Sequence, residues 1–278
     1  MSADGGREAV LLVHGLGGTQ YDLGSMHKIL QRAGLATHAL TLPGHGSSPE
    51  RLLDVQAEDW LEAVDDTYHA LLPEYDQVHL VGMCMGALLA VEVAKRTGHA
   101  RGKLVALAPP VFIDGWSTPW YAGVRHLVYR LPQVPQRMRV VEEEPFGIKN
   151  DLIRAIVKSK FNRGDNFHYR WVPLHCIRQV DRLRHWVMQG LSSIACPTLI
   201  VHAREDELTS VRSAQFLQRE IGPQRTRMVI VENSYHMICI DNDRQQVAES
   251  VLEHLGADPA LARRRRPHAG DAGDAAAD

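Results

Sequence analysis

The chain has 278 residues, of which 45% are hydrophobic and 23% are charged, and its formal net charge is −2. This composition is typical of a soluble globular protein and excludes a chain that is mainly disordered, collagenous or coiled-coil. The near-neutral charge also argues against a nucleic-acid binder that depends on bulk positive charge. The length allows two domains, although single α/β units reach about 250 residues.

Neither a signal peptide nor a membrane span is expected. The first apolar run, 9–13, is too short for the hydrophobic part of a signal peptide. The apolar stretch 78–94 is shorter than the ~20 residues that a spanning helix needs, and it contains His79 and Glu92. The four cysteines form no CxxC pair and no recognisable disulfide framework. We therefore expect a reduced, cytoplasmic protein.

Short apolar runs alternate with helical segments in two parts of the chain. The expected elements are strands at 9–13, 37–42, 77–83, 103–108, 198–203 and 227–231, and helices at 23–33, 57–72, 85–96, 211–221 and 244–255. Continuous apolar runs are typical of strands that are buried on both faces. Strands that alternate with helices imply right-handed crossovers, so the pattern predicts an α/β fold with a doubly wound, mostly parallel sheet.

The segment 111–195 interrupts this alternation. It is rich in helical pieces and prolines and shows no clear strand, so we interpret it as a helical cap inserted into the α/β core. The core then comprises 1–110 and 196–256. The segment 257–278 consists mainly of Ala, Asp and Arg, and we expect it to be a disordered tail.

The predicted cap has an unusual composition. It holds four of the five tryptophans, Trp116, Trp120, Trp171 and Trp186. We expect some of its aromatic residues to form the cap's own core and the rest to line an apolar acyl pocket. It also holds thirteen basic and seven acidic residues, so it carries +6 while the rest of the chain carries −8. The positive cap either rests on a negative body or docks an anionic substrate.

Cys84 lies in a nucleophile-elbow pattern. The run Gly82-Met83-Cys84-Met85-Gly86 separates an expected strand from an expected helix, and a nucleophile occupies the central position of such a turn. The N-terminus of the helix would shift the thiol toward thiolate. The alternative is that Cys84 is a small buried apolar residue beside two methionines. We interpret it as the nucleophile.

A nucleophile of this kind needs a base and an orienting acid. In this architecture nucleophile, acid and histidine follow one another along the chain, at the carboxyl ends of strands. We predict that Asp206 is the acid and that Glu205 and Glu207 are its solvated neighbours. Asp114, after the fourth strand, is the alternative acid. His236, which lies between the last strand and the last helix, is the predicted base.

The remaining site residues are main-chain amides. His14-Gly15-Leu16-Gly17-Gly18 follows the first strand, and we predict that the N–H groups of Leu16 and Met85 form an oxyanion hole. His14 and His45 are expected to be structural residues that bind loop backbone. Cys176, Cys196 and Cys239 are expected to be inert core thiols.

Several motifs together resemble the α/β-hydrolase superfamily, in particular its bacterial carboxylesterase and monoacylglycerol-lipase-like group. They are LLVHGLGG, LPGHG, DVQAEDWLEAV, GMCMG, PTLIVHAREDELT and ENSYHMICIDNDRQQV. The resemblance implies an ester hydrolase with a cap, a triad at Cys84, Asp206 and His236, and oxyanion amides at Leu16 and Met85. The predicted mechanism needs no cofactor and no metal. The chain departs from the family pattern because cysteine replaces the nucleophilic serine.

The leading hypothesis is an acyl hydrolase that cleaves an ester or thioester through a covalent acyl-thioester intermediate. The alternative is an acyltransferase that passes the acyl group to an amine, a hydroxyl or another acceptor. A ligand-binding receptor on the same fold is disfavoured because all three triad members are present. The expected partner is a small-molecule acyl ester or thioester. Acyl-coenzyme A and an acyl carrier protein are the candidate thioester donors, and no nucleic-acid partner is expected.

Overall fold

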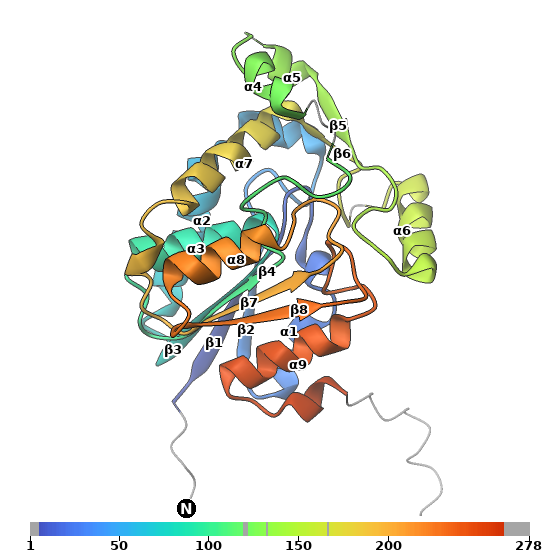
Figure 1. Cartoon of the computed structure of the whole chain (residues 1–278). Coiled ribbons are helices and arrows are strands. Elements are labelled where there is room, and N and C mark those ends of the chain that lie inside the picture. Colours follow the sequence, from blue (N-terminus) through green and yellow to red (C-terminus); the bar gives the residue numbers. More distant parts are fainter. Residues whose placement is uncertain (1–5, 119–121, 132, 166, 264–278) are drawn as a thin grey trace, which may run out of the picture.

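The computed structural model describes residues 6–118, 122–131, 133–165 and 167–263, and it is built around one central sheet (Figure 1). Its six strands run in the order β2-β1-β3-β4-β7-β8, and all neighbouring strands are parallel. The strands are β1 (Glu8–Val13), β2 (Ala36–Leu40), β3 (Gln77–Met83), β4 (Leu104–Leu107), β7 (Thr198–Ala203) and β8 (Thr226–Val231). The carboxyl ends of the strands therefore meet at one edge of the sheet.

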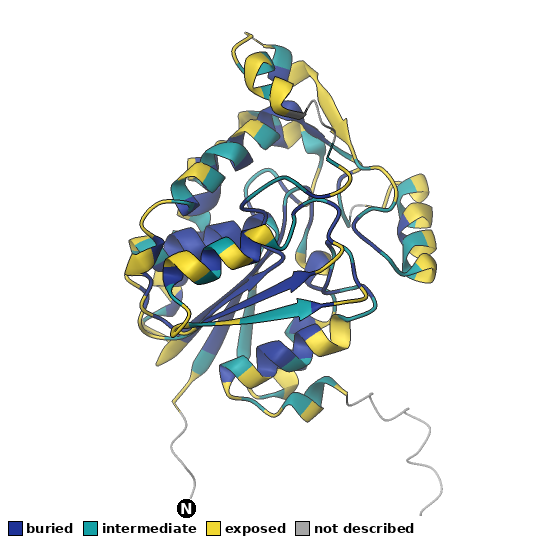
Figure 2. Cartoon of the chain, viewed as in Figure 1, coloured by how far each residue is buried: buried dark blue, intermediate teal, exposed yellow. Residues whose placement is uncertain are grey.

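Helices cover both faces of this sheet, so its central strands are buried on both sides (Figure 2). One face packs against α2 (Ala57–Leu71), α3 (Met85–Arg96) and α8 (Arg212–Ile221), and the other against α1 (Met26–Arg32) and α9 (Arg244–Leu255). Continuous apolar strands gain the most from this two-sided burial. The doubly wound parallel sheet predicted from the alternation is confirmed.

Most predicted elements have the bounds that the sequence indicates, but the first helix differs. A single helix is expected at 23–33, whereas the structure has a short 3₁₀ helix, η1 (Gln20–Leu23), followed by α1. Gly24 separates the two with φ of +57°, a conformation that only glycine adopts at low cost. Residues after β2 also form a 3₁₀ helix, η2 (Pro49–Asp54).

The inserted segment, residues 111–195, is called the cap below and lies over the carboxyl-end edge of the sheet (Figure 1). Its elements are η3 (Ala122–Val124), α4 (Arg125–Val128), α5 (Val134–Arg137), β5 (Arg139–Val141), α6 (Asp151–Arg163), β6 (Trp171–Pro173), α7 (Leu174–Val187) and η4 (Leu191–Ser193). The strands β5 and β6 form an antiparallel pair, although no strand was expected here. Three residues per strand are too few to produce a recognisable alternation.

The chain after α9 is partly ordered. Residues 257–263 were expected to begin a disordered tail, but they include η5 (Pro259–Ala262), and Leu261 packs against the core beneath α9. Arg263 donates two hydrogen bonds to Glu249. The rest of the expected tail lies outside the described residues, as does Trp120 of the cap. None of the described helices is long and apolar enough to cross a membrane.

Candidate active site

Cys84 occupies a strained turn between β3 and α3. Its φ and ψ angles are 54° and −124°, which a residue with a side chain rarely adopts. Its N–H donates to the carbonyl of Leu107 in the neighbouring strand at 2.9 Å, and its own carbonyl accepts the first hydrogen bond of α3 from Ala87. The thiol therefore lies at the N-terminus of a twelve-residue helix.

The two glycines of the elbow have no space for a side chain. A Cβ atom on Gly82 would lie 2.1 Å from the carbonyl oxygen of Gly86, and one on Gly86 would lie 2.2 Å from that of Val13. Real Cβ atoms do not approach backbone oxygens this closely. The glycines thus allow β3, α3 and the end of β1 to pack tightly around Cys84.

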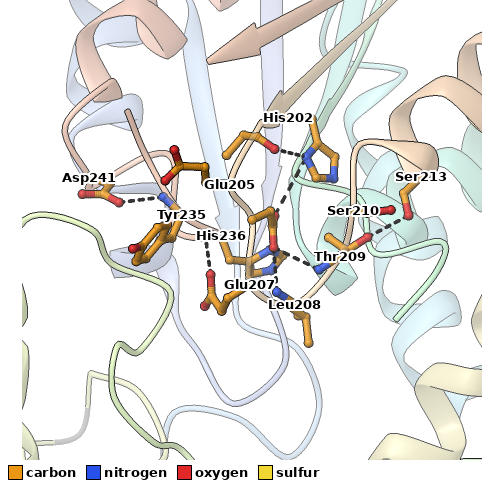
Figure 3. A network of polar contacts seen from close by, with 12 residues as sticks. His202, Glu205, Glu207, Leu208, Thr209, Ser210, Ser213, Tyr235, His236 and Asp241 are labelled. Carbon is orange, nitrogen blue, oxygen red and sulfur yellow. Dashed lines mark hydrogen bonds and ion pairs between the residues drawn. The ribbon is translucent and has the colours of Figure 1, made fainter. Parts of the chain in front are cut away.

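The predicted acid and base are in direct contact. Nδ1 of His236, in the loop between β8 and α9, lies 2.8 Å from Oδ2 of Asp206, which follows β7. The other oxygen of Asp206 accepts the N–H groups of Leu208 and Thr209 at 2.9 and 3.0 Å. The carboxylate of Asp206 is therefore held by two main-chain N–H groups as well as by the imidazole. Figure 3 shows Leu208, Thr209 and His236 gathered in this network.

Electrostatics around this pair favour an imidazolium. Burial alone would lower the pKa of His236, but Asp206 and, to a lesser degree, Cys84 raise it well above 6.5. Burial would likewise raise the pKa of Asp206, yet the charge of His236 lowers it below its usual value. Nε2 of His236 makes no regular hydrogen bond to any described residue. This nitrogen is the one available to a nucleophile and its substrate.

Glu207 is not the solvated neighbour that we expected. It is buried, and its Oε2 accepts the main-chain N–H of His236 at 3.1 Å. Burial raises the pKa of this carboxyl. Glu205, in contrast, is exposed and pairs with Lys149 of the cap at 2.7 Å, as a solvated neighbour would.

Asp114, the alternative acid, has other partners. Its Oδ1 accepts the N–H of Ser210 at 2.9 Å, and its Oδ2 pairs with Arg212 at 2.8 Å. Its carboxylate therefore supports the segment between Asp206 and α8.

Asp241 supports the site although its sequence pattern did not predict a role there. It is fully buried, and its oxygens accept the N–H groups of Tyr235, Lys149 and Asn150 at 2.7 to 2.9 Å. It thus joins the loop of His236 to the cap. An aspartate just before a helix is ordinarily interpreted as a helix cap, so its sequence position alone gave no signal of this role.

The predicted oxyanion amides lie in the two turns that flank Cys84. Neither the Leu16 N–H nor the Met85 N–H donates a hydrogen bond to any described residue, so both are free to bind a ligand. A Cβ atom on Gly15 would lie 3.6 Å from the Cys84 sulfur, which places this loop directly against the thiol.

The other histidines and cysteines considered have structural surroundings. His14 and His45 each bond loop backbone through both ring nitrogens. The three remaining cysteines are buried and free, and burial raises the pKa of all three thiols, to about 12 in Cys176 and Cys239. The described part of the chain contains no group of three or more His, Cys, Asp or Glu side chains that could hold a metal ion.

The sequence model of the Alpha/beta hydrolase family matches residues 10–250, so the chain belongs to this family. The carboxylesterase of Bacillus subtilis (strain 168) is 26% identical, over 90% of this chain and 93% of its own length. The thermostable monoacylglycerol lipase of Bacillus sp. (strain H-257) is 24% identical, over 90% and 91%.

A solved structure supports the same fold. That of the Paleococcus ferrophilus monoacylglycerol lipase aligns with a TM-score of 0.73 and 19% identity, covering 90% of this chain and 95% of its own. Fold, family and named relatives together identify an enzyme of the esterase class. The resemblance inferred from the motifs is confirmed at this level.

Proposed function

We propose that the protein is an acyl hydrolase that cleaves an ester or thioester through Cys84, His236 and Asp206. One observation carries the proposal: the imidazole of a buried histidine contacts a buried aspartate at 2.8 Å, and a cysteine in a strained turn at the N-terminus of α3 raises the pKa of that histidine. Each group has the surroundings that its role needs. The helix N-terminus and the imidazolium both stabilise a thiolate, and the aspartate fixes the ring.

The reaction follows from this arrangement. The thiolate of Cys84 attacks the acyl carbon, and the carbonyl electrons move to the oxygen, which the amides of Leu16 and Met85 stabilise. The intermediate collapses to a thioester as His236 gives its proton to the departing alcohol or thiol. Water then loses a proton to His236 while its oxygen attacks the thioester. A second collapse releases the carboxylic acid and the Cys84 thiolate.

A panel of acyl esters and acyl thioesters, offered with and without an amine acceptor, tests this proposal. Cys84→Ala should abolish turnover, and Cys196→Ala, a buried thiol of the same kind, should retain it. Full activity of Cys84→Ala would contradict the mechanism. Amide product in place of the free acid would identify an acyltransferase, because an amine competes with water for the same thioester.

The charge of the cap favours an anionic donor within this class. Lys149 and Arg182 pair with carboxylates of the body, and other basic residues pair within the cap. A further set is exposed and makes no ion pair with any described residue: Arg130, Arg137, Arg139, Arg170 and Arg178. Guanidinium groups suit phosphate, so this set supports docking of acyl-coenzyme A or an acyl carrier protein.

Salt dependence tests this finer proposal. Exposed charges are screened beyond about 8–10 Å at ionic strengths of 0.1–0.15 M. The kcat/KM for an acyl-coenzyme A should therefore fall as salt rises, whereas a neutral ester with the same acyl chain should show almost no fall. Equal salt slopes for the two substrates would contradict an anionic donor.

A further inference from the structure

A short cap segment, Phe167–Tyr169, is attached to the loop that carries the Leu16 amide. The N–H of Tyr169 donates to the carbonyl of Gly17 at 2.7 Å. The hydroxyl of Thr19 donates to the carbonyl of Phe167 at 2.9 Å. Two backbone groups of the cap segment are thus fixed to positions just after Leu16. We call Phe167–Tyr169 the strap.

Gly17 is held on its other side as well. Its N–H donates to Nε2 of His45 at 3.0 Å, and burial lowers the pKa of His45 to about 3, so this nitrogen stays an acceptor. The ring of His45 stacks on Tyr169, with ring centres 6.0 Å apart and an interplanar angle of 8°. The hydroxyl of Tyr169 donates to Gly44 at 2.9 Å. Both main-chain polar groups of Gly17 therefore have partners that involve the strap.

His168, in the middle of the strap, forms a charged bridge from cap to body. Its Nδ1 lies 3.3 Å from Oδ1 of Asp22 in η1, and its Nε2 lies 3.9 Å from Glu142, which follows β5. Only 15% of the His168 side chain and 5% of the Asp22 side chain are exposed. His168 also acts electrostatically on His14 and His45, and burial lowers the pKa of both.

The charge on His168 persists over a wide pH range. Burial alone would lower its pKa, but Asp22 and then Glu142 raise it to about 10. A cation between two carboxylates in a mostly buried place is strongly held, and removal of one partner leaves an uncompensated charge.

The bridge lies against the backbone next to the predicted oxyanion hole. A Cβ atom on Gly17 would lie 3.3 Å from Nε2 of His168. A Cβ atom on Gly15 would lie 3.5 Å from Oδ2 of Asp22 and 3.6 Å from the sulfur of Cys84. Gly15 and Gly17 flank Leu16, so the backbone around the Leu16 N–H is enclosed between the thiol and the ion pair.

We propose that His168 is a positioning residue: with the strap and Asp22 it fixes the Leu16 N–H, so the cap must be seated before the oxyanion hole is complete. The role of the strap as a cap-to-loop connection rests on the contacts above, whereas its effect on catalysis rests on the proposed function. The cap then has a part in the chemical step in addition to any part in substrate binding.

His168→Gln, which removes the cation, tests this role. The kcat for a neutral ester should fall about tenfold to hundredfold, because complete loss of an oxyanion donor costs about 10²–10³, while KM should change less than about twofold. His185→Gln, at an exposed histidine of α7, is the matched control and should leave both constants unchanged. Unchanged kcat in His168→Gln, or a rise in KM alone, would overturn the proposal.

Alkylation of Cys84 by iodoacetamide separates this proposal from the proposed function. Alkylation needs the thiolate but no oxyanion hole, so its rate should stay within about twofold of wild type in His168→Gln. Equal loss of alkylation and turnover would show a general collapse of the site and overturn the positioning role. Failure of the proposed function would appear elsewhere, as activity retained in Cys84→Ala.

A double-mutant cycle tests the pairing itself. If His168 acts through Asp22, the double variant with His168→Gln and Asp22→Asn should lower kcat no further than the more damaging single variant does. Purely multiplicative losses would contradict this.

A variant at Thr19 tests the strap if His168→Gln does not fold. Thr19→Val removes the hydroxyl bound to Phe167 and should still lower kcat severalfold without changing alkylation. Wild-type kcat in a folded Thr19→Val would then overturn the strap's role.

Discussion

The carboxylate of Glu207 accepts the main-chain N–H of His236, while the adjacent Asp206 contacts the imidazole of the same residue. Two consecutive acidic residues thus hold one histidine by its backbone and by its ring. Glu207→Leu should destabilise the fold by about 1–3 kcal/mol, because a buried N–H loses its partner. Glu207→Gln keeps an acceptor and should lose less. Thermal unfolding of both variants checks this, and equal losses would contradict it.

Asp206, and not Asp114, should govern activity. Loss of the orienting acid costs about 10⁴ in kcat in serine triads, so we expect a fall of several orders of magnitude for Asp206→Asn. Asp114→Asn breaks contacts to Ser210 and Arg212 and should change kcat only slightly. Steady-state kinetics on one ester decides between them, and the opposite ranking would reassign the acid.

The titration of His236 should respond to both of its partners. Its pKa is raised well above 6.5, chiefly by Asp206 and then by Cys84, so both Asp206→Asn and Cys84→Ala should lower it, the former more. The raised pKa contributes to the free energy of unfolding. This contribution is fully present below about pH 6.5, the unfolded pKa, and is lost as the pH rises through the pKa of His236 in the folded protein. Histidine-ring NMR titrations measure the shifts. A pKa that is insensitive to Asp206→Asn would contradict the assignment.

The elbow should not tolerate a methyl group. A Cβ atom at Gly86 would overlap the carbonyl of Val13, so Gly86→Ala should cost about 1–3 kcal/mol through overpacking and should disturb Cys84. No atom of a residue that the structure describes lies within 4 Å of a Cβ added at Gly123, which makes Gly123→Ala the matched control. Urea unfolding of the two variants gives the comparison, and equal stabilities would argue against tight packing at the elbow.

The four thiols should differ sharply in reactivity. Iodoacetamide should label Cys84 well before the other three, since burial raises the pKa of Cys176, Cys196 and Cys239 and so keeps them protonated. Peptide mapping at partial labelling identifies the modified residue. Preferential labelling of any other cysteine would contradict a reactive thiolate at the elbow.

Much of the core could be predicted from the sequence because its signals are local. The apolar runs of β3 and β7 and the helical run of α3 have the predicted bounds. The elbow glycines and the acidic residues after β7 could be assigned to one edge of the sheet, since parallel strands bring their carboxyl ends together. The cap lacked such signals: β5 and β6 have three residues each and pair across 29 residues of chain.

The residues that support the site could not be predicted, because their roles depend on distant contacts. Glu207 looks solvated in a run of charges, yet it is buried against the loop of His236. Asp241 lies just before a helix, where an aspartate ordinarily caps the helix N-terminus. Its carboxylate instead accepts the main-chain N–H groups of Lys149 and Asn150, which belong to the inserted segment. His168 is one of 15 histidines, and only the folded chain brings it to Asp22. Burial and pairing of this kind leave no pattern in a single sequence.

Intact mass spectrometry of the protein after brief incubation with acyl thioesters and esters tests the central claim most directly. We predict a mass increase equal to one acyl group, located at Cys84 by peptide mapping and removed by hydroxylamine, as expected for a thioester. Asp206→Asn should accumulate less of this adduct, and Cys84→Ala should form none. Turnover without any adduct at Cys84, under conditions that slow deacylation, or an adduct that persists in Cys84→Ala, would contradict a covalent cysteine mechanism.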